Sequence, residues 1–373
     1  MNFLNSKIFM VIILFPYLNI YFFSNGTFKP VIYIWGIVSF FSTLLIFFTI
    51  NRKLDRFDIL VIYYFTFTIL VALINRTLSI GIFYSIISLA GIIIFLNFYC
   101  KINLKNFISA LYYLYTTAAL INFFTMIINF EESGETFYFL GGKNNIAMIL
   151  LPTVIIVTLY SYLIKKKLTL INKLIVLTCL LSMQISESGT ALVITLLIIL
   201  FFIIYKKLFI RFSEYLFIYA LLFFSMVIFK LQETILNNFI TGYLNKDVTM
   251  SGRTFLWDIA LDNIKQNWLI GYGRGNSIIN NSNSHLSEVH NGILEILLST
   301  GFIGLIIFIL IFVLINRKMN NYKSHVFVKL LSFSIFLYMI MGLSESVFNQ
   351  FQFWVLLILA YNCNNLIKQS EKI

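Results

Sequence analysis

The chain has 373 residues, of which 60% are hydrophobic and only 11% charged, and its mean hydropathy is +0.91. A soluble domain is nearer half apolar and a quarter charged, so this composition excludes an ordinary soluble protein and indicates a polytopic membrane protein. The net charge of +12 comes from basic residues that punctuate the ends of apolar runs. That placement is typical of membrane orientation and argues against a nucleic-acid-binding face.

The apolar runs predict an all-α protein with about twelve membrane-spanning helices, since roughly 20 apolar residues cross a hydrocarbon core as a helix. The first run lacks a small-residue cleavage site, which favours a retained span over a cleaved signal. The pair 171–186 and 190–205 could instead form one broken or re-entrant element. The predicted spans are 8–24, 30–50, 59–75, 79–99, 107–129, 146–164, 171–186, 190–205, 213–230, 291–315, 326–343 and 351–367.

The charges also predict the orientation of these spans. With both termini in the cytoplasm, most of the 27 basic residues fall on the inside, and every short inside loop obeys the positive-inside rule. The long polar segment 231–290 then faces the exterior. We therefore expect a single membrane domain, residues 1–373, with one large extracytoplasmic loop.

Within that loop, the segment 251–271 predicts an amphipathic helix along the outer membrane surface, with its tryptophans at headgroup level. Ser251 or Thr254 can cap its start, and Gly271 can end it. A surface anchor explains the apolar stripe but not Arg253, because the start of a helix favours anions. An arginine beside free backbone N–H groups would make a cradle for a phosphate or diphosphate. The stripe consists of Trp257, Leu261, Ile264 and Trp268.

The segment 271–275, Gly-Tyr-Gly-Arg-Gly, superficially resembles a phosphate loop. It lacks the Lys-Ser/Thr ending of a P-loop and follows a helix rather than a strand, so nucleotide binding fits poorly. A tight turn that presents Arg274 is the better interpretation.

Three ionisable residues, His285, Glu288 and His290, cluster before the span at 291–315. Their spacing is not that of a His-Glu-x-x-His zinc site, and the three scattered cysteines suggest neither a metal nor a disulfide framework. His290 stands at the mouth of the span, where a histidine can act as a general base near neutral pH. Asn291 and Glu295 share a face of the following helix. A glutamate one turn into a span is costly unless it faces a wet cavity or a partner.

Three further polar segments fall at the same predicted outer level. Each alone reads as an ordinary hydrated loop. Together they would gather Lys143, Glu187 and Glu345 at one membrane face, as a polar, partly anionic, lipid-linked substrate would require. The segments are 141–145, 187–190 and 345–346.

Several motifs between 251 and 304 follow one another in a recognisable order: Ser-Gly-Arg at 251–253, Trp257, Gly-Tyr-Gly at 271–273, His290-Asn291, Leu294-Glu295 and Gly-Phe-Ile-Gly at 301–304. In this order they resemble the signature region of the O-antigen polymerase and O-antigen ligase superfamily. The segments 143–147 and 188–191 are similar to weaker upstream motifs of the same group. The resemblance implies an inverting glycosyltransferase that joins polyprenyl-diphosphate-linked sugars at the outer face of the plasma (inner) membrane, with neither a metal nor a cofactor.

The resemblance also implies roles for individual residues. Arg253 would hold the diphosphate of the donor and stabilise the leaving group, and His290 would take the proton from the incoming sugar hydroxyl. Family members often carry an arginine at the motif 188–190, where this chain offers Glu187. A second cation on the diphosphate would then come from Lys143 or Arg274. The other predicted substrate-binding residues are Trp257, Asn291, Glu295, Glu187 and Glu345.

We favour a polymerase of capsular or exopolysaccharide repeat units over a ligase. A ligase hands glycan to a lipid A core, which exists only in cells with an outer membrane, and the Ile-, Asn-, Lys- and Phe-rich composition hints at an AT-rich genome. The expected partners are a polyprenyl-diphosphate-linked oligosaccharide, the bilayer, a chain-length regulator and a flippase, and no nucleic acid.

Two other functional classes stay open. A flippase or transporter of lipid-linked oligosaccharides would suit twelve spans, but transporters tend to carry internal repeats and polar groups at mid-membrane. A receptor or structural membrane protein would use the outer loop to bind a partner. The enzyme interpretation requires Arg253 and His290 to lie within reach of one diphosphate-sugar.

Overall fold

The computed structural model describes residues 6–49, 53–128, 137–207, 210–231, 253–282 and 288–371, and within these ranges the chain is all-helical. Six helical segments are long and apolar enough to cross a membrane, in agreement with the predicted polytopic class. They are Gly26–Thr49, which contains α3 (Lys29–Thr49), α4 (Arg56–Ile74), α5 (Ile80–Ile102), α6 (Leu104–Ile127), α7 (Lys143–Lys165) and α15 (Gly292–Asn320).

The other six predicted spans fall on apolar helices of 10–17 residues, so the count of twelve stays a prediction. These are α1 (Lys7–Leu14) with η1 (Phe15–Leu18), α8 (Leu170–Ile185), α9 (Gly189–Ile204), α10 (Phe212–Phe223) with η3 (Phe224–Ile228), α16 (Val326–Met341) and α17 (Phe351–Tyr361). The remaining helical elements are α2 (Tyr21–Ser24), η2 (Gly26–Phe28), α13 (Arg253–Gln266), α14 (Ile278–Ser282) and α18 (Cys363–Glu371).

The predicted first span, 8–24, is divided in the structure. Pro16 lies at the start of η1, and the left-handed backbone of Asn19 (φ 52°) ends this helix. Asparagine tolerates that conformation better than most residues do. The chain therefore turns at Asn19, and α2 runs in a new direction.

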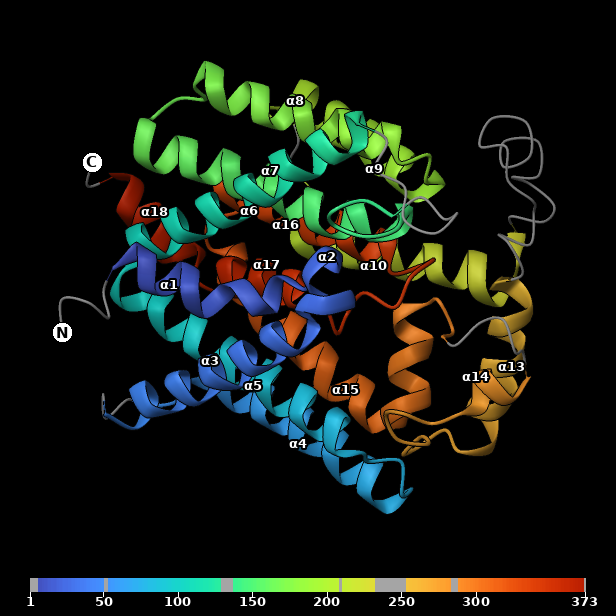
Figure 1. The fold of residues 1–373 in the computed structure, drawn as a ribbon. Helices are drawn as coiled ribbons and strands as arrows, with labels where there is room; N and C mark the ends of the chain where they lie inside the picture. Colours follow the sequence, from blue (N-terminus) through green and yellow to red (C-terminus); the bar gives the residue numbers. More distant parts are fainter. Residues whose placement is uncertain are drawn as a thin grey trace.

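The two ends of the helix bundle differ. Figure 1 shows α18 and the start of α1 at one end, with α13 and α14 at the opposite end. Between them α7, α16 and α17 form the buried centre, and every residue of α17 is buried. Helices α13 and α14 of the predicted outer loop thus lie at the end opposite the two terminal helices, while the side that faces the cytoplasm stays a prediction.

A capping box fixes the start of α4 at the end of the bundle that carries α18. The Oδ1 atom of Asp55 accepts hydrogen bonds from the backbone N–H groups of Phe57 and Asp58, both at 2.9 Å. In return the carboxylate of Asp58 accepts from the backbone N–H of Asp55 at 3.1 Å. This reciprocal pair satisfies N–H groups that a helix start otherwise leaves without partners.

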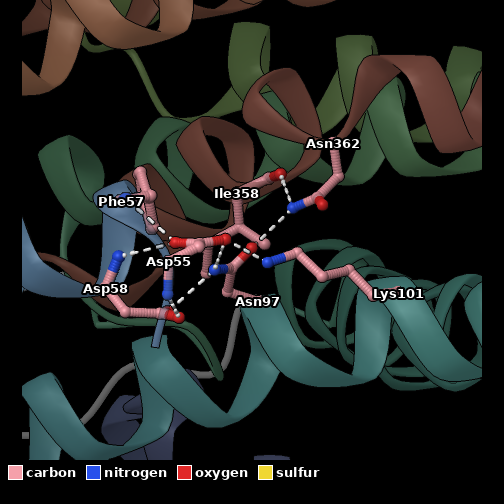
Figure 2. A network of polar contacts seen from close by, with 7 residues as sticks. All are labelled: Asp55, Phe57, Asp58, Asn97, Lys101, Ile358 and Asn362. Carbon is pink, nitrogen blue, oxygen red and sulfur yellow. Dashed lines mark hydrogen bonds and ion pairs between the residues drawn. The ribbon is translucent and has the colours of Figure 1, made fainter. Parts of the chain in front are cut away.

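Buried amides connect this capping box to two other helices (Figure 2). Asn97 of α5 donates from Nδ2 to Asp58 Oδ1 at 2.7 Å, and Asn362 after α17 donates to Asn97 Oδ1 at 2.8 Å. Lys101 forms an ion pair with Asp55. The network therefore joins the ends of α4, α5 and α17 through groups that are satisfied internally, as buried polar groups must be.

We expect the charge of Asp55 to stabilise the fold at neutral pH. Burial acts to raise the pKa of Asp55, but Lys101, the backbone N–H of Asp58 and Asn97 outweigh it and hold the pKa below its ordinary range. A lowered carboxyl pKa contributes stability above about pH 4, and that stability is lost as the pH falls through the lowered value. Asp55→Ala should lower the free energy of unfolding by about 1–2 kcal/mol through loss of the cap.

Thermal unfolding of the purified protein between pH 3 and 7 checks this expectation. Asp55→Asn is the matched control because asparagine caps a helix as well as aspartate does, but it cannot titrate. The asparagine variant should lose less stability than the wild type on acidification. An identical pH dependence in the two proteins would contradict the role of the charge.

Candidate functional site

One carboxylate joins the two residues that the sequence predicts as catalytic. Glu345, in the turn between α16 and α17, accepts a hydrogen bond at Oε1 from Arg253 Nη2 at 2.6 Å, and its Oε2 lies 3.2 Å from His290 Nδ1. Arg253 is the first residue of α13, and His290 immediately precedes the N-cap of α15. The side chains are 15%, 23% and 8% exposed for Arg253, His290 and Glu345. Charges this shielded interact more strongly than exposed ones and are less screened by salt.

Asn291 explains why His290 is held at the mouth of α15. Its Oδ1 caps the helix by accepting from the N–H groups of Ile293 and Leu294, and its Nδ2 donates to the Leu343 carbonyl at 3.0 Å. Asn291 is fully buried, so its amide is consumed in fastening α15 to the turn that carries Glu345. His290 itself has a left-handed backbone (φ 48°), which is uncommon for a histidine. Asn291 therefore has a structural role in this arrangement, and its predicted contact with a substrate stays a prediction.

A close backbone contact reinforces the same junction. The N–H of Gly292 donates to the Gly342 carbonyl at 2.8 Å. A Cβ atom at position 292 would lie 2.6 Å from the ring of Phe348. Only glycine lets α15 approach the α16–α17 turn this closely.

Helix α13 packs into the protein instead of lying along a lipid surface. Trp257 is fully buried, and Leu256 and Ala260 are buried beside it. An ion pair of 2.7 Å between Lys230 and Asp258 fastens the outer side. The prediction that Trp257 sits at headgroup level is therefore wrong, and its role in substrate binding stays a prediction. A stripe of apolar residues has the same spacing whether it faces lipid or protein.

The rest of the predicted amphipathic segment behaves differently. Trp268 lies beyond the end of α13 and is 56% exposed, with its ring centroid 6.2 Å from that of Phe302. The predicted end at Gly271 falls five residues after the last residue of the helix, Gln266. Of the two predicted caps, Ser251 lies outside the described residues and Thr254 lies inside the helix.

The segment 271–275 is a turn packed on α15 and not a phosphate loop. The N–H groups of Tyr272 and Gly273 donate to the carbonyls of Leu298 and Ser299 at 2.7 and 3.0 Å, so they are not available to an anion. Helix α15 accommodates this contact by a kink at Gly301 (φ 60°, ψ −162°). The prediction of a tight turn is confirmed.

Arg274 is presented by that turn and is half-buried. Within the described part of the chain it forms no hydrogen bond or ion pair of its own. Together with His290 and Glu288 it acts electrostatically on Glu295, which lies one turn into α15 and is also half-buried. The roles of Arg274 and Glu295 in substrate binding stay predictions.

The three polar segments predicted at one level do come together. Ser188 donates to Asn144 Oδ1 at 3.1 Å, and the hydroxyls of Thr190 and Ser344 lie 3.1 Å apart. The break between α8 and α9 therefore contacts both the start of α7 and the residue next to Glu345. Lys143 and Glu187 stay exposed at the edge of this cluster. Their roles in binding remain predictions.

A pocket of about 560 Å³ opens beside His290 and Glu345. Its wall includes Leu18, Asn19, Tyr21 and Ser24, which lie in the predicted first span 8–24, and Asn25 just after it. The only sequence feature that indicates this wall is the scatter of asparagine and glutamine residues in otherwise apolar runs. The lining residues besides His290 and Glu345 are Leu18, Asn19, Tyr21, Ser24, Asn25, Leu140, Asn145, Met148, Ile149, Glu288, Ser346, Gln350 and Gln352. Among the described residues, no group of three or more His, Cys, Asp or Glu side chains is arranged to hold a metal ion.

Comparison with known protein families finds one match. A family model described as O-antigen ligase covers residues 173–309. No curated protein matches the chain. The matched segment contains Arg253, His290 and the 271–304 motifs, and it confirms the resemblance seen in them; Glu345 and the N-terminal wall of the pocket lie outside it.

Proposed function

We propose that this chain, whose residues 173–309 match the O-antigen ligase family model, polymerises polyprenyl-diphosphate-linked oligosaccharide repeat units. The reaction is an inverting glycosyl transfer at the outer face of the plasma membrane. The observation that carries this proposal is the shared carboxylate of Glu345, which holds Arg253 and His290 at one place although they come from different helices. A diphosphate-sugar is large enough to reach both.

In the proposed step, His290 acts on the attacking hydroxyl and Arg253 acts on the leaving diphosphate. His290 accepts the proton of an acceptor sugar hydroxyl, and the oxygen attacks the anomeric carbon of the donor. The bond from that carbon to the diphosphate breaks as the new glycosidic bond forms. The electron pair leaves with the polyprenyl diphosphate, whose growing negative charge Arg253 stabilises. Because attack and departure take place on opposite faces of the anomeric carbon in this step, the product has inverted configuration.

The tautomer of His290 follows from its neighbour. A proton on Nδ1 can be donated to Glu345 Oε2 at 3.2 Å, which leaves Nε2 unprotonated and able to act as the base. Glu345 then has the part that a carboxylate plays beside a catalytic histidine in hydrolases, where it sets the tautomer and the ring orientation. We assign Glu345 as a positioning residue, in place of the substrate contact expected from the sequence.

Arg274 is the better candidate for the second cation on the diphosphate. It is half-buried, has no ion-pair partner within the described residues, and shares with His290 an electrostatic effect on Glu295. Lys143 is exposed at the start of α7 and has no such connection. An arginine also offers the planar pair of donors that suits a phosphate group.

A ligase would use the same residues with another acceptor, and a flippase would need none of them as a base. The candidate site residues Arg253, His290 and Glu345 lie together at a helix start, a helix mouth and a turn, and not midway along the helices, which supports an enzyme over a transporter. The proposed partners are the lipid-linked oligosaccharide within the bilayer, with a flippase that delivers it and a regulator that sets chain length.

Deletion of the gene in its host, followed by analysis of lipid-linked and surface glycans, tests the proposal. A polymerase leaves a single repeat unit on the polyprenyl carrier at the outer leaflet and no surface polymer. A plasmid copy of the wild-type gene should restore the polymer. Long polymer that never reaches its acceptor would instead identify a ligase. Single units confined to the cytoplasmic leaflet would identify a flippase and overturn the assignment of the site.

A further inference from the structure

Three of the amide side chains in the wall of the pocket beside His290 have no protein partner among the described residues. Asn25, Asn145 and Gln350 line it, and none of their side chains makes a hydrogen bond within the described residues. Ser346 also lines it, and its hydroxyl oxygen is buried without a partner. Buried polar atoms are rarely left unpaired. The buried hydroxyl of Ser346 therefore points to a polar ligand. The amides of Asn25 and Asn145 are exposed and that of Gln350 is half-buried, so they are open to the same ligand.

The charges around the pocket exclude a diphosphate as that ligand. Among the described residues, no lysine or arginine lines the pocket, and Arg253 is not part of the wall. The two acidic side chains that line it, Glu288 and Glu345, would repel phosphate and carboxylate groups. An uncharged ligand is favoured.

The chemistry of the wall suits a sugar. An amide offers two donors and an acceptor, which complements the hydroxyl groups of a carbohydrate. Tyr21 adds an aromatic ring, held in place by stacking on Phe137 with ring centroids 4.6 Å apart. A volume of about 560 Å³ is within the range of small-molecule sites.

The wall is built into the fold. Gln352 of α17 donates to the Leu18 carbonyl at 2.9 Å, and the N–H of Phe22 donates to the Phe139 carbonyl at 3.2 Å. The left-handed turn at Asn19 directs α2 across the pocket. The N-terminal wall is thus fixed to α17 and to the segment before α7, and its position does not depend on a ligand.

We propose that this pocket is the acceptor subsite, which takes the uncharged sugar that carries the attacking hydroxyl. The proposal rests on the proposed function. His290 and Glu345 stand in the pocket wall, so a sugar bound there presents its hydroxyl to His290. Arg253 donates to Oε1 of Glu345 and does not line the pocket. The donor diphosphate would therefore bind on the Arg253 side of Glu345. The Glu345 carboxylate separates the two substrates.

Binding by the purified full-length protein in nanodiscs tests this assignment with two probes. One is undecaprenyl diphosphate, and the other is the oligosaccharide released by mild acid from the lipid-linked pool of the deletion strain. The double variant Asn145→Ala/Gln350→Ala should bind the oligosaccharide about tenfold more weakly, because two hydrogen-bonding side chains are lost from the pocket. Its affinity for undecaprenyl diphosphate should not change. Arg253→Ala should show the reverse pattern.

Asn320→Ala is the matched control, because Asn320 is an exposed asparagine at the far end of α15. It should bind both probes as the wild type does. Loss of undecaprenyl diphosphate binding in the double variant would overturn the proposal and make the pocket the donor site. Unchanged binding of both probes in the double variant would also overturn it.

A different set of results would reject the proposed function itself. If the deletion strain accumulates no lipid-linked oligosaccharide, or if the wild-type protein binds neither probe, the glycosyltransferase assignment fails. Linkage analysis of the surface polymer gives an independent check on the pocket alone. The sugar that carries the linkage formed between repeat units should have no carboxylate or phosphate, and a uronic acid at that position would overturn the acceptor assignment.

Discussion

Sugar transfer is expected to fall by about 10²–10⁴-fold when His290 is replaced by alanine and by about 10²–10³-fold when Arg253 is replaced. The first variant lacks the base for the acceptor hydroxyl, and the second leaves the charge of the departing diphosphate without its nearest cation. The measurement is repeat-unit polymerisation by purified protein, supported by gel analysis of surface polymer. Polymer should be lost in both strains at normal protein levels.

Two further variants separate chemistry from folding. Arg253→Lys keeps the positive charge but not the planar pair of donors, so it should retain part of the activity. The double alanine variant of Arg253 and His290 should have nearly the same activity as the less active single variant, because the effects of residues that act on one step are not additive. All variants should elute as the wild type does in size-exclusion chromatography. Polymer of wild-type length from both alanine variants would reject the catalytic assignment.

The local half of this site could be predicted from the sequence. Arg253, the 271–275 turn and His290 lie in one polar interval, where charge and glycine stand out from an apolar background. The structure adds why those glycines are needed. A Cβ atom on Gly271 would lie 2.7 Å from the backbone nitrogen of Gly301, so the turn and the kink of α15 fit together only through two glycines.

The long-range half could not be predicted. Glu345 is 92 residues from Arg253 in sequence, and nothing in its local pattern tells which of the polar segments it will contact. Trp257 was placed at the lipid surface because hydrophobic periodicity does not distinguish lipid from protein as the partner. The pocket wall near Asn19 was missed because one asparagine in an apolar run does not outweigh its hydropathy in a span-length window.

The remaining large effect is expected at Glu345, which touches both catalytic residues. Glu345→Gln keeps the size of the side chain but removes its charge. The new amide N–H can donate to Nδ1 of His290, which favours the tautomer with the proton on Nε2 and blocks the base. In a catalytic triad the same exchange lowers turnover by about 10⁴-fold, and here a loss of at least about 10²-fold is expected.

Donor binding should change in the opposite direction. Arg253 pairs with the Glu345 carboxylate at 2.6 Å. A diphosphate must therefore compete with this carboxylate for Arg253. Removal of that charge should therefore tighten the binding of undecaprenyl diphosphate while turnover falls. Titration of nanodisc-embedded Glu345→Gln with undecaprenyl diphosphate, beside single-turnover assays, measures the two effects separately.

The split between affinity and rate is what distinguishes a positioning residue from a structural one. A residue needed only for folding would lower the binding of both substrates and the thermal stability together. Glu345→Asp is the informative control, because it keeps the charge but is one methylene too short to reach Arg253 and His290 at once. If Glu345→Gln turns over as fast as the wild type, the carboxylate does not orient His290. In that case the Arg253–Glu345 pair serves only to hold α13 against the turn between α16 and α17.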